Sequence, residues 1–89
     1  MPDNRDDWHL YLIRCRGGQL YTGITTNVAR RFDEHCEGKG AKFLRGKGPL
    51  QLEFSERIGT QSEALKAEIR VKKMRKIEKE AVIRQGSIA

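Results

Sequence analysis

The stretch 9–35 constrains the fold of this chain more than any other part of its sequence. Two short runs of β-forming residues, 8–15 and 19–24, lie on either side of a glycine pair, and this pattern is typical of a β-hairpin. A segment with helical periodicity follows at once, in which Arg31 and His35 are four residues apart and therefore share one face. Adjacent elements thus deliver two tyrosines, an arginine and a histidine to one candidate site.

The length of the hairpin loop decides which side chains meet. A two-residue loop would place Tyr11 and Tyr21 on opposite faces of the sheet. A three-residue loop over 16–18 would pair Ile13 with Tyr21, so that both tyrosines share a face. It would also set Gly23 opposite Tyr11, where the missing side chain leaves room for the phenol ring. We favour the three-residue loop, although the local sequence is compatible with both.

The rest of the sequence predicts an α+β domain with three strands and three helices. The first strand is apolar on both faces, as central strands usually are, whereas a third run alternates apolar and polar residues. Thr26 or Asn27 can cap the first helix, and Thr60 and Glu63 form a capping box at the start of the second. We expect strands over 8–15, 19–24 and 50–55, helices over 27–37, 61–74 and 77–85, a disordered tail over 1–7, one domain over 8–85 and a short tail over 86–89.

The two cysteines show no metal-binding or disulfide pattern. Cys15 and Cys36 lack a CxxC or Cys–His spacing, so we expect both to be packing residues in a reduced, cytoplasmic protein. Cys36 would continue the apolar stripe that Val28 and Phe32 begin on the first helix. No apolar run approaches the roughly 20 residues that a membrane span needs, and the polar first residues do not resemble a signal peptide. We therefore expect no membrane partner.

The charge of the chain indicates a polyanionic partner. The formal net charge is +6, and the basic residues gather in the glycine-rich stretch 38–48 and in the second half of the chain. Glycine-rich basic loops let backbone N–H groups approach phosphates closely, although 38–48 could equally be a solvated connector with one helical turn near 41–44. The candidate contacts to nucleic acid are Lys39, Lys42, Arg45, Lys47, Lys72 and Lys73.

Glu68 is the unusual residue of the second long helix. At about 100° per residue it falls about 40° from Ala64, inside the apolar arc of the helix. A carboxylate in that position requires a positive or hydrogen-bonding partner, and Arg31 and a divalent cation are the two candidates. One carboxylate, together with waters and phosphate oxygens, is a common environment for Mg²⁺.

The tyrosines, Arg31 and His35 could share a reaction. Tyrosine becomes a useful base where neighbouring cations favour the phenolate, and Arg31 would also stabilise a phosphoryl group in its transition state. His35 could relay a proton or hold a phosphate. Taken singly, such residues are more often packing tyrosines, structural ion pairs or helix-end histidines. Together with Glu68 they are the components of phosphodiester hydrolysis.

At these residues the chain resembles the GIY-YIG nuclease family, and most closely its small stand-alone bacterial members. The resemblance covers 8–85 and rests on His-Leu-Tyr at 9–11, Tyr-Thr-Gly at 21–23, an arginine eight residues past the glycine, a histidine four residues further and Glu68. The first tripeptide lacks the glycine and isoleucine of the family pattern. The resemblance implies a three-stranded antiparallel sheet flanked by helices and metal-dependent phosphodiester cleavage. It implies catalytic roles for Tyr11, Tyr21, Arg31, His35 and Glu68, with Glu68 as the ligand of Mg²⁺ or Mn²⁺.

Three functions remain open at this point. The leading one is an endonuclease, with DNA favoured over RNA and a role in DNA repair or processing. The others are a non-catalytic nucleic-acid-binding module and a nuclease subunit that is active only with a protein partner. Binding by counterion release needs no pair of tyrosines, which argues against the module. The sequence contains no base-reading helix motif or cysteine–histidine finger, which favours a partner that supplies specificity.

Overall fold

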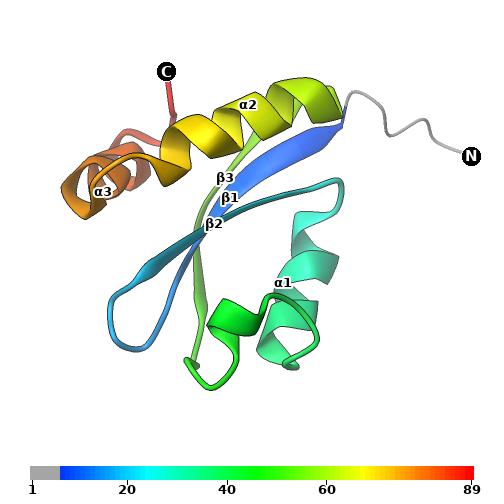
Figure 1. Cartoon of the computed structure of the whole chain (residues 1–89), viewed down its shortest axis with the longest axis vertical. Coiled ribbons are helices and arrows are strands. Elements are labelled where there is room, and N and C mark those ends of the chain that lie inside the picture. Colours follow the sequence, from blue (N-terminus) through cyan, green and yellow to red (C-terminus); the bar gives the residue numbers. More distant parts are fainter. Residues whose placement is uncertain (1–6) are drawn as a thin grey trace, which may run out of the picture.

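In the computed structural model, which describes residues 7–89, a three-stranded antiparallel sheet carries helices on both faces (Figure 1). The expected α+β class is confirmed. Of the tail expected over 1–7, only Asp7 belongs to the described residues. The elements follow in the order β1 (Trp8–Arg14), β2 (Leu20–Thr25), α1 (Val28–Cys36), the 3-10 turn η1 (Lys42–Leu44), β3 (Gln51–Gly59), α2 (Gln61–Lys72) and α3 (Lys76–Gln85).

The hairpin between β1 and β2 has the three-residue loop. Ile13 pairs with Tyr21 and Tyr11 pairs with Gly23, so the favoured register is confirmed. The N–H of Cys15 donates to the carbonyl of Gln19 over 2.8 Å and closes the loop. The strand order is β2-β1-β3, which makes β1 the central strand, as its two apolar faces predict, and leaves β2 at one edge of the sheet.

Side chains of β1 alternate between two cores, one on each face of the sheet. Leu10 and Leu12 face α2 and α3, whereas Tyr11 and Ile13 face α1 and η1. Figure 1 shows the same division, with α2 and α3 together on one side of the sheet and α1 on the other. The first core is completed by Phe54, Ala67, Val71 and Val82, and the second by Cys15 and Leu44.

One expectation about α1 is wrong. Cys36 is exposed, and His35 is buried in its place. Both residues fit a helical stripe that begins at Val28 and Phe32, because they lie three and four positions beyond Phe32. His35 turns inward to a place where both of its ring nitrogens find hydrogen-bond partners, which offsets the burial of a polar ring.

The ends of the elements follow local chemistry. The side chain of Asn27 caps α1 by accepting from the N–H of Arg30, and Thr60 and Glu63 form the expected capping box of α2.

Strand β3 is longer than expected and continues to Gly59 instead of ending near 55. Its polar residues after 55 still pair with β1, so tertiary pairing extends a strand that local alternation alone would have ended.

Helix α3 is fixed to the sheet by an ion pair. The guanidinium of Arg14 on β1 donates two hydrogen bonds to the carboxylate of Glu80, at 2.6 and 2.8 Å, and Glu53 of β3 lies 3.6 Å away. After α3, the side chain of Ile88 packs against the core beneath α2, and its N–H donates to Glu56. Within residues 7–89, no helix is long and apolar enough to cross a membrane.

Candidate active site

Tyr11 and His35 form the buried centre of the candidate site. The Tyr11 hydroxyl lies 2.8 Å from Nε2 of His35, and each residue is only 2% exposed. Two glycines make this contact possible, because a Cβ at Gly23 would collide with the phenol and one at Gly40 would collide with the imidazole. The pairing of Tyr11 with Gly23 therefore positions the phenol, as the hairpin register predicts.

The hydrogen bonds of His35 fix its tautomer. The backbone N–H of Ala41 donates to Nδ1 over 3.2 Å, so the neutral ring carries its proton on Nε2 and donates it to the Tyr11 oxygen. Burial lowers the pKa of His35, and the nearby charge of Arg31 lowers it further. His35 thus acts as a neutral hydrogen-bond donor to Tyr11. Neither ring nitrogen is left for the phosphate contact that the sequence suggested.

Burial also governs the protonation of Tyr11. It raises the pKa of the phenol to about 12, with a smaller contribution from Tyr21, whereas the guanidinium of Arg31 acts in the opposite direction. Arg31 therefore offsets burial only in part. The charge of Glu68, a residue of α2, is the smallest of the causes that raise the pKa of Tyr11.

Tyr21 and Arg31 surround this centre from two elements. The Tyr21 ring lies on the same sheet face as Tyr11, with centroids 6.4 Å apart, and meets His35 edge-on at 5.5 Å. Arg31 is oriented by Glu34, whose Oε1 lies 3.1 Å from Nη1, and this hydrogen bond raises the pKa of the guanidinium. Arg31 and Tyr21 are both half-buried, so solvent reaches the site from their side.

Glu68, the fifth candidate residue, belongs to α2, and its side chain is 17% exposed. Its ion-pair partner is Lys72, one helical turn further, with Nζ 3.4 Å from Oε2. The sequence reasoning named Arg31 and a divalent cation as candidate partners of Glu68 and did not include Lys72. Within residues 7–89, no three histidine, cysteine or carboxylate side chains gather into a metal-binding cluster, so Glu68 would hold a cation together with waters and substrate oxygens.

Comparison with known proteins identifies the family of this chain. A family model described as the GIY-YIG catalytic domain matches residues 7–80, which include all five candidate catalytic residues. The chain belongs to the GIY-YIG family. It is 59% identical over 78 residues to a UPF0213 protein of Cronobacter sakazakii, covering 88% of this chain and 82% of that protein. It is 54% identical over 81 residues to the UPF0213 protein YhbQ of Escherichia coli, covering 91% of this chain and 81% of that protein.

Solved structures of GIY-YIG relatives agree with the fold described above. The solution NMR structure of a UPF0213 protein from Bacillus halodurans is 36% identical, with a TM-score of 0.59 over 91% of this chain and 86% of that one. The solution NMR structure of a protein from E. faecalis is 34% identical, with a TM-score of 0.62 over 96% of this chain and 90% of that one.

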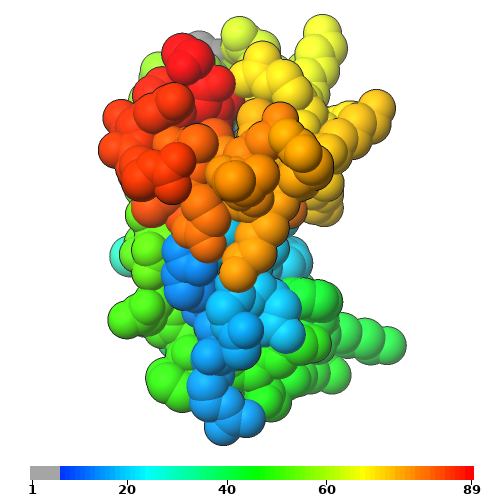
Figure 2. All heavy atoms as spheres, turned by 90° about the vertical axis from the view of Figure 1, so that its left-hand side faces the viewer, coloured from blue at the N-terminus to red at the C-terminus, as the bar shows by residue number. Residues whose placement is uncertain are grey.

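The candidate nucleic-acid contacts of this GIY-YIG domain lie on two segments that flank β2. Figure 2 shows long side chains of α2 and of the segment around 42–45 projecting from the same side of the molecule, above and below β2. Lys39 pairs with Glu37 at 3.7 Å, and Lys47 lies over the ring of Phe43 with Nζ 4.0 Å from the centroid. Lys42, Arg45, Lys72 and Lys73 are exposed.

Three residues beside the GIY-YIG site were not identified from the sequence. Phe43 stacks on Tyr21, and Thr22 and Lys79 line a hollow next to it. An aromatic residue within a basic, glycine-rich stretch is a signal that could have identified Phe43, because such rings serve as stacking platforms for bases. Nothing local could have identified Lys79, which reaches the site from the last helix.

Proposed function

We propose that this GIY-YIG chain is a metal-dependent endonuclease that hydrolyses phosphodiester bonds, with DNA favoured over RNA and a role in DNA repair or processing. The observation that supports the proposal is the buried hydrogen bond between Tyr11 and His35, with the guanidinium of Arg31 beside the same phenol. Membership of a nuclease family supports this chemistry. A surface that only binds phosphates requires exposed cations and no such buried pair as Tyr11 and His35.

Tyr11 is the general base of the proposed reaction and takes the proton of the attacking water when it is a phenolate. His35 donates its Nε2–H to the same oxygen, and the guanidinium of Arg31 lies beside it, so both stabilise the phenolate. Arg31 also neutralises a non-bridging oxygen of the scissile phosphate. Tyr21, on the same face, donates its hydroxyl to the phosphate.

Glu68 is the proposed ligand of Mg²⁺ or Mn²⁺, and its surroundings suit a hard cation. It is one partly exposed carboxylate, and Mg²⁺ is commonly held by one or two carboxylates with waters and phosphate oxygens. When bound, the cation would supply positive charge to the leaving oxygen. The exposed ammonium of Lys72 can exchange its contact with Glu68 for a substrate phosphate, because surface ion pairs are weak.

Glu68→Gln tests this proposal. The amide is a poorer ligand for a hard cation, so we expect cleavage of labelled single-stranded, branched and nicked DNA to fall by about 100-fold or more, with folding and DNA affinity close to wild type. The matched control is Glu37→Gln, the same change on an exposed side chain after α1, which should cut at the wild-type rate. RNA of the same sequence and reactions with EDTA are run in parallel.

A stability measurement separates metal binding from a structural role of Glu68. Magnesium should raise the melting temperature of the wild type and leave that of Glu68→Gln unchanged, because a ligand stabilises only the state that binds it. If Glu68 serves only as the partner of Lys72, the variant would lose stability and still cut at the wild-type rate. That outcome would show the proposed metal-dependent mechanism to be wrong at its central residue.

A further inference from the structure

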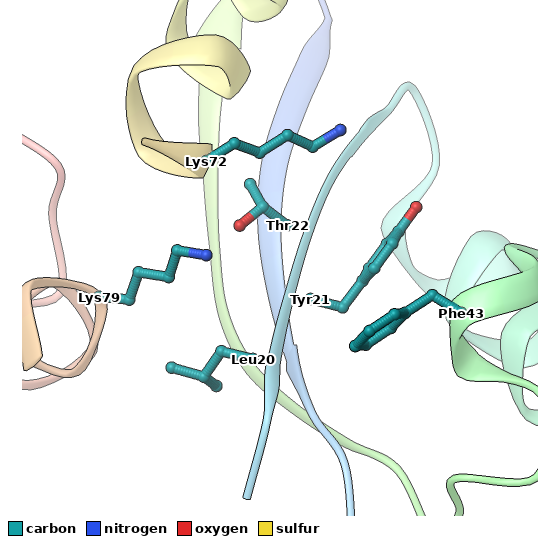
Figure 3. Close-up of a pocket in the computed structure, with 6 residues that line it drawn as sticks. All are labelled: Leu20, Tyr21, Thr22, Phe43, Lys72 and Lys79. Atoms are coloured by element: carbon teal, nitrogen blue, oxygen red, sulfur yellow. The ribbon is translucent and has the colours of Figure 1, made fainter. Parts of the chain in front are cut away.

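A hollow of about 250 Å³ lies at the outer edge of β2, beside the candidate active site (Figure 3). The strand runs through it, so its lining comes from both faces of the sheet. An aromatic pair forms one wall, and two lysines, a hydroxyl and an aliphatic side chain form the other. The lining residues are Tyr21 and Phe43 on the first side and Lys72, Lys79, Thr22 and Leu20 on the second.

Thr22 provides a polar group that the fold does not use. It is only 3% exposed, and its Oγ1 is the sole buried side-chain oxygen or nitrogen within residues 7–89 that lacks a hydrogen-bond partner. Figure 3 shows this oxygen directed from β2 to the side on which the Lys79 amino group lies. An unpaired buried hydroxyl destabilises a protein, so this oxygen has a hydrogen bond to gain from a ligand atom in the hollow.

Phe43 provides a platform on the opposite wall. Its ring is 46% exposed and stacks on Tyr21, with centroids 6.1 Å apart and an interplanar angle of 23°. The amino group of Lys47 lies over this ring, and such an exposed cation–π contact is weaker than the stacking of a base. A planar base can therefore displace Lys47 from the ring.

We infer that this hollow binds one unpaired nucleotide of the substrate strand, next to the phosphodiester that is cut. Its base stacks on the wall formed by Phe43 and Tyr21. Its phosphate lies between Lys72 and Lys79 and accepts a hydrogen bond from the Thr22 hydroxyl. This inference rests on the proposed function and adds the substrate class, which is DNA that is single-stranded or frayed at the phosphodiester that is cut. A base inside a duplex is covered on both faces by its neighbours and cannot enter.

Size and position support one nucleotide in this place. Pockets for drug-sized molecules have volumes of about 300–1,000 Å³, so a hollow of about 250 Å³ is on the scale of a single nucleotide. Lys72 connects the two sites, since it lines the hollow and also contacts Glu68. Lys79 is half-buried, and a partly buried ammonium gains from an anion beside it.

The test measures binding in EDTA, so that it does not depend on cleavage. Wild type should bind a short oligothymidylate more tightly than a duplex of the same length at the same salt concentration. Phe43→Leu keeps apolar bulk against Tyr21 and removes the aromatic face. It should lose about tenfold in affinity for the oligothymidylate and keep its affinity for the duplex. A fluorescent adenine analogue in a single strand should be quenched on binding wild type and not on binding this variant.

Lysine variants provide a control matched in charge. Lys79→Gln and Lys66→Gln each remove one positive charge, but Lys66 lines a different hollow on α2. We expect Lys66→Gln to weaken single-strand and duplex binding to the same small extent. Lys79→Gln should weaken single-strand binding more, and so reduce the preference for single strands.

Thr22→Val separates ligand binding from damage to the fold. Valine has nearly the shape of threonine and no hydroxyl, so the free protein should melt at a higher temperature because a buried unpaired polar atom is gone. The same variant should bind oligothymidylate severalfold more weakly. A variant that is more stable and binds less tightly cannot owe its lost affinity to misfolding.

The outcomes separate this inference from the nuclease assignment. If Phe43→Leu loses affinity equally for single strands and duplex, or loses none, the hollow is not a nucleotide subsite, even if the wild type cuts DNA with magnesium. If the preference for single strands depends on Phe43, Thr22 and Lys79 but no cleavage occurs with magnesium or manganese, the subsite stands and the nuclease function is wrong.

Discussion

At the scale of single residues, the buried phenol of Tyr11 makes stability depend on alkaline pH. Burial raises its pKa from 10.0 to about 12 in the folded protein, whereas the unfolded chain releases the proton near 10.0. Between these values the unfolded state binds fewer protons than the folded state, so the free energy of unfolding falls as pH rises. Tyr11→Phe cannot titrate. We therefore expect the stability difference between wild type and Tyr11→Phe to be constant below pH 10 and to narrow towards pH 12.

Urea denaturation of both proteins across this pH range measures the difference. Other groups titrate in the same range, and comparison of the two proteins cancels their contribution. Tyr11→Phe also loses the hydrogen bond from His35, which gives an offset that does not vary with pH in this window. A difference that stays constant or widens above pH 10 would show that burial does not hold Tyr11 in its protonated form.

The sequence was sufficient to place some of these residues, but not to predict their tautomers or their ion-pair partners. Tyr11 could be placed opposite Gly23 because loop length fixes the register of a hairpin. The tautomer of His35 could not be predicted, since it depends on the N–H of Ala41 in the segment that follows α1. For Glu68, the sequence reasoning considered Arg31 and a divalent cation as partners and missed Lys72, which lies one helical turn away.

At the scale of elements, the position of α3 depends on Arg14. Its guanidinium makes two hydrogen bonds to Glu80 and also lies near Glu53, so one residue joins β1 to α3 and β3. Arg14→Ala leaves two carboxylates without this cation, and we expect it to lower the urea midpoint of unfolding. The exposed Arg57, which pairs with Asp7 at 3.4 Å, provides the matched control, since Arg57→Ala should change the midpoint little.

A binding measurement distinguishes this role of Arg14 from general stabilisation. Lys79 of the nucleotide hollow belongs to the helix that Arg14 holds, so Arg14→Ala should also reduce affinity for oligothymidylate under conditions where the variant is fully folded. Equal midpoints for the two alanine variants would contradict the assignment of Arg14 as the anchor of α3.

Caps and turns of the elements could be predicted from local sequence, whereas this contact joins residues 66 positions apart and had no local signal.

At the scale of the whole molecule, the fold converts a diffuse positive charge into one basic side. A net charge of +6 does not say where a polyanion binds, and the two basic segments are separated in sequence by β3. The strand order places β2 at an edge, and α2 and the segment around 42–45 extend long side chains on either side of it (Figure 2). The sheet and its central strand could be predicted from the sequence. That the two basic segments lie on the same side of the molecule could not, because their relative position depends on how the helices pack on the sheet.

The salt dependence of binding tests whether the segment 38–48 contacts the phosphate backbone. Each phosphate contact to a single strand contributes a slope of about −0.7 to the plot of log affinity against log salt concentration. Lys42→Glu and Arg45→Glu should therefore each weaken binding of oligothymidylate at low salt and make this slope less steep by about 0.7. Arg57→Glu changes the net charge equally, but it lies on β3 at the opposite edge of the sheet, so its slope should match that of the wild type. If all three variants give the wild-type slope, Lys42 and Arg45 contact no phosphate, and the segment is a solvated connector whose role is to carry Phe43 to Tyr21.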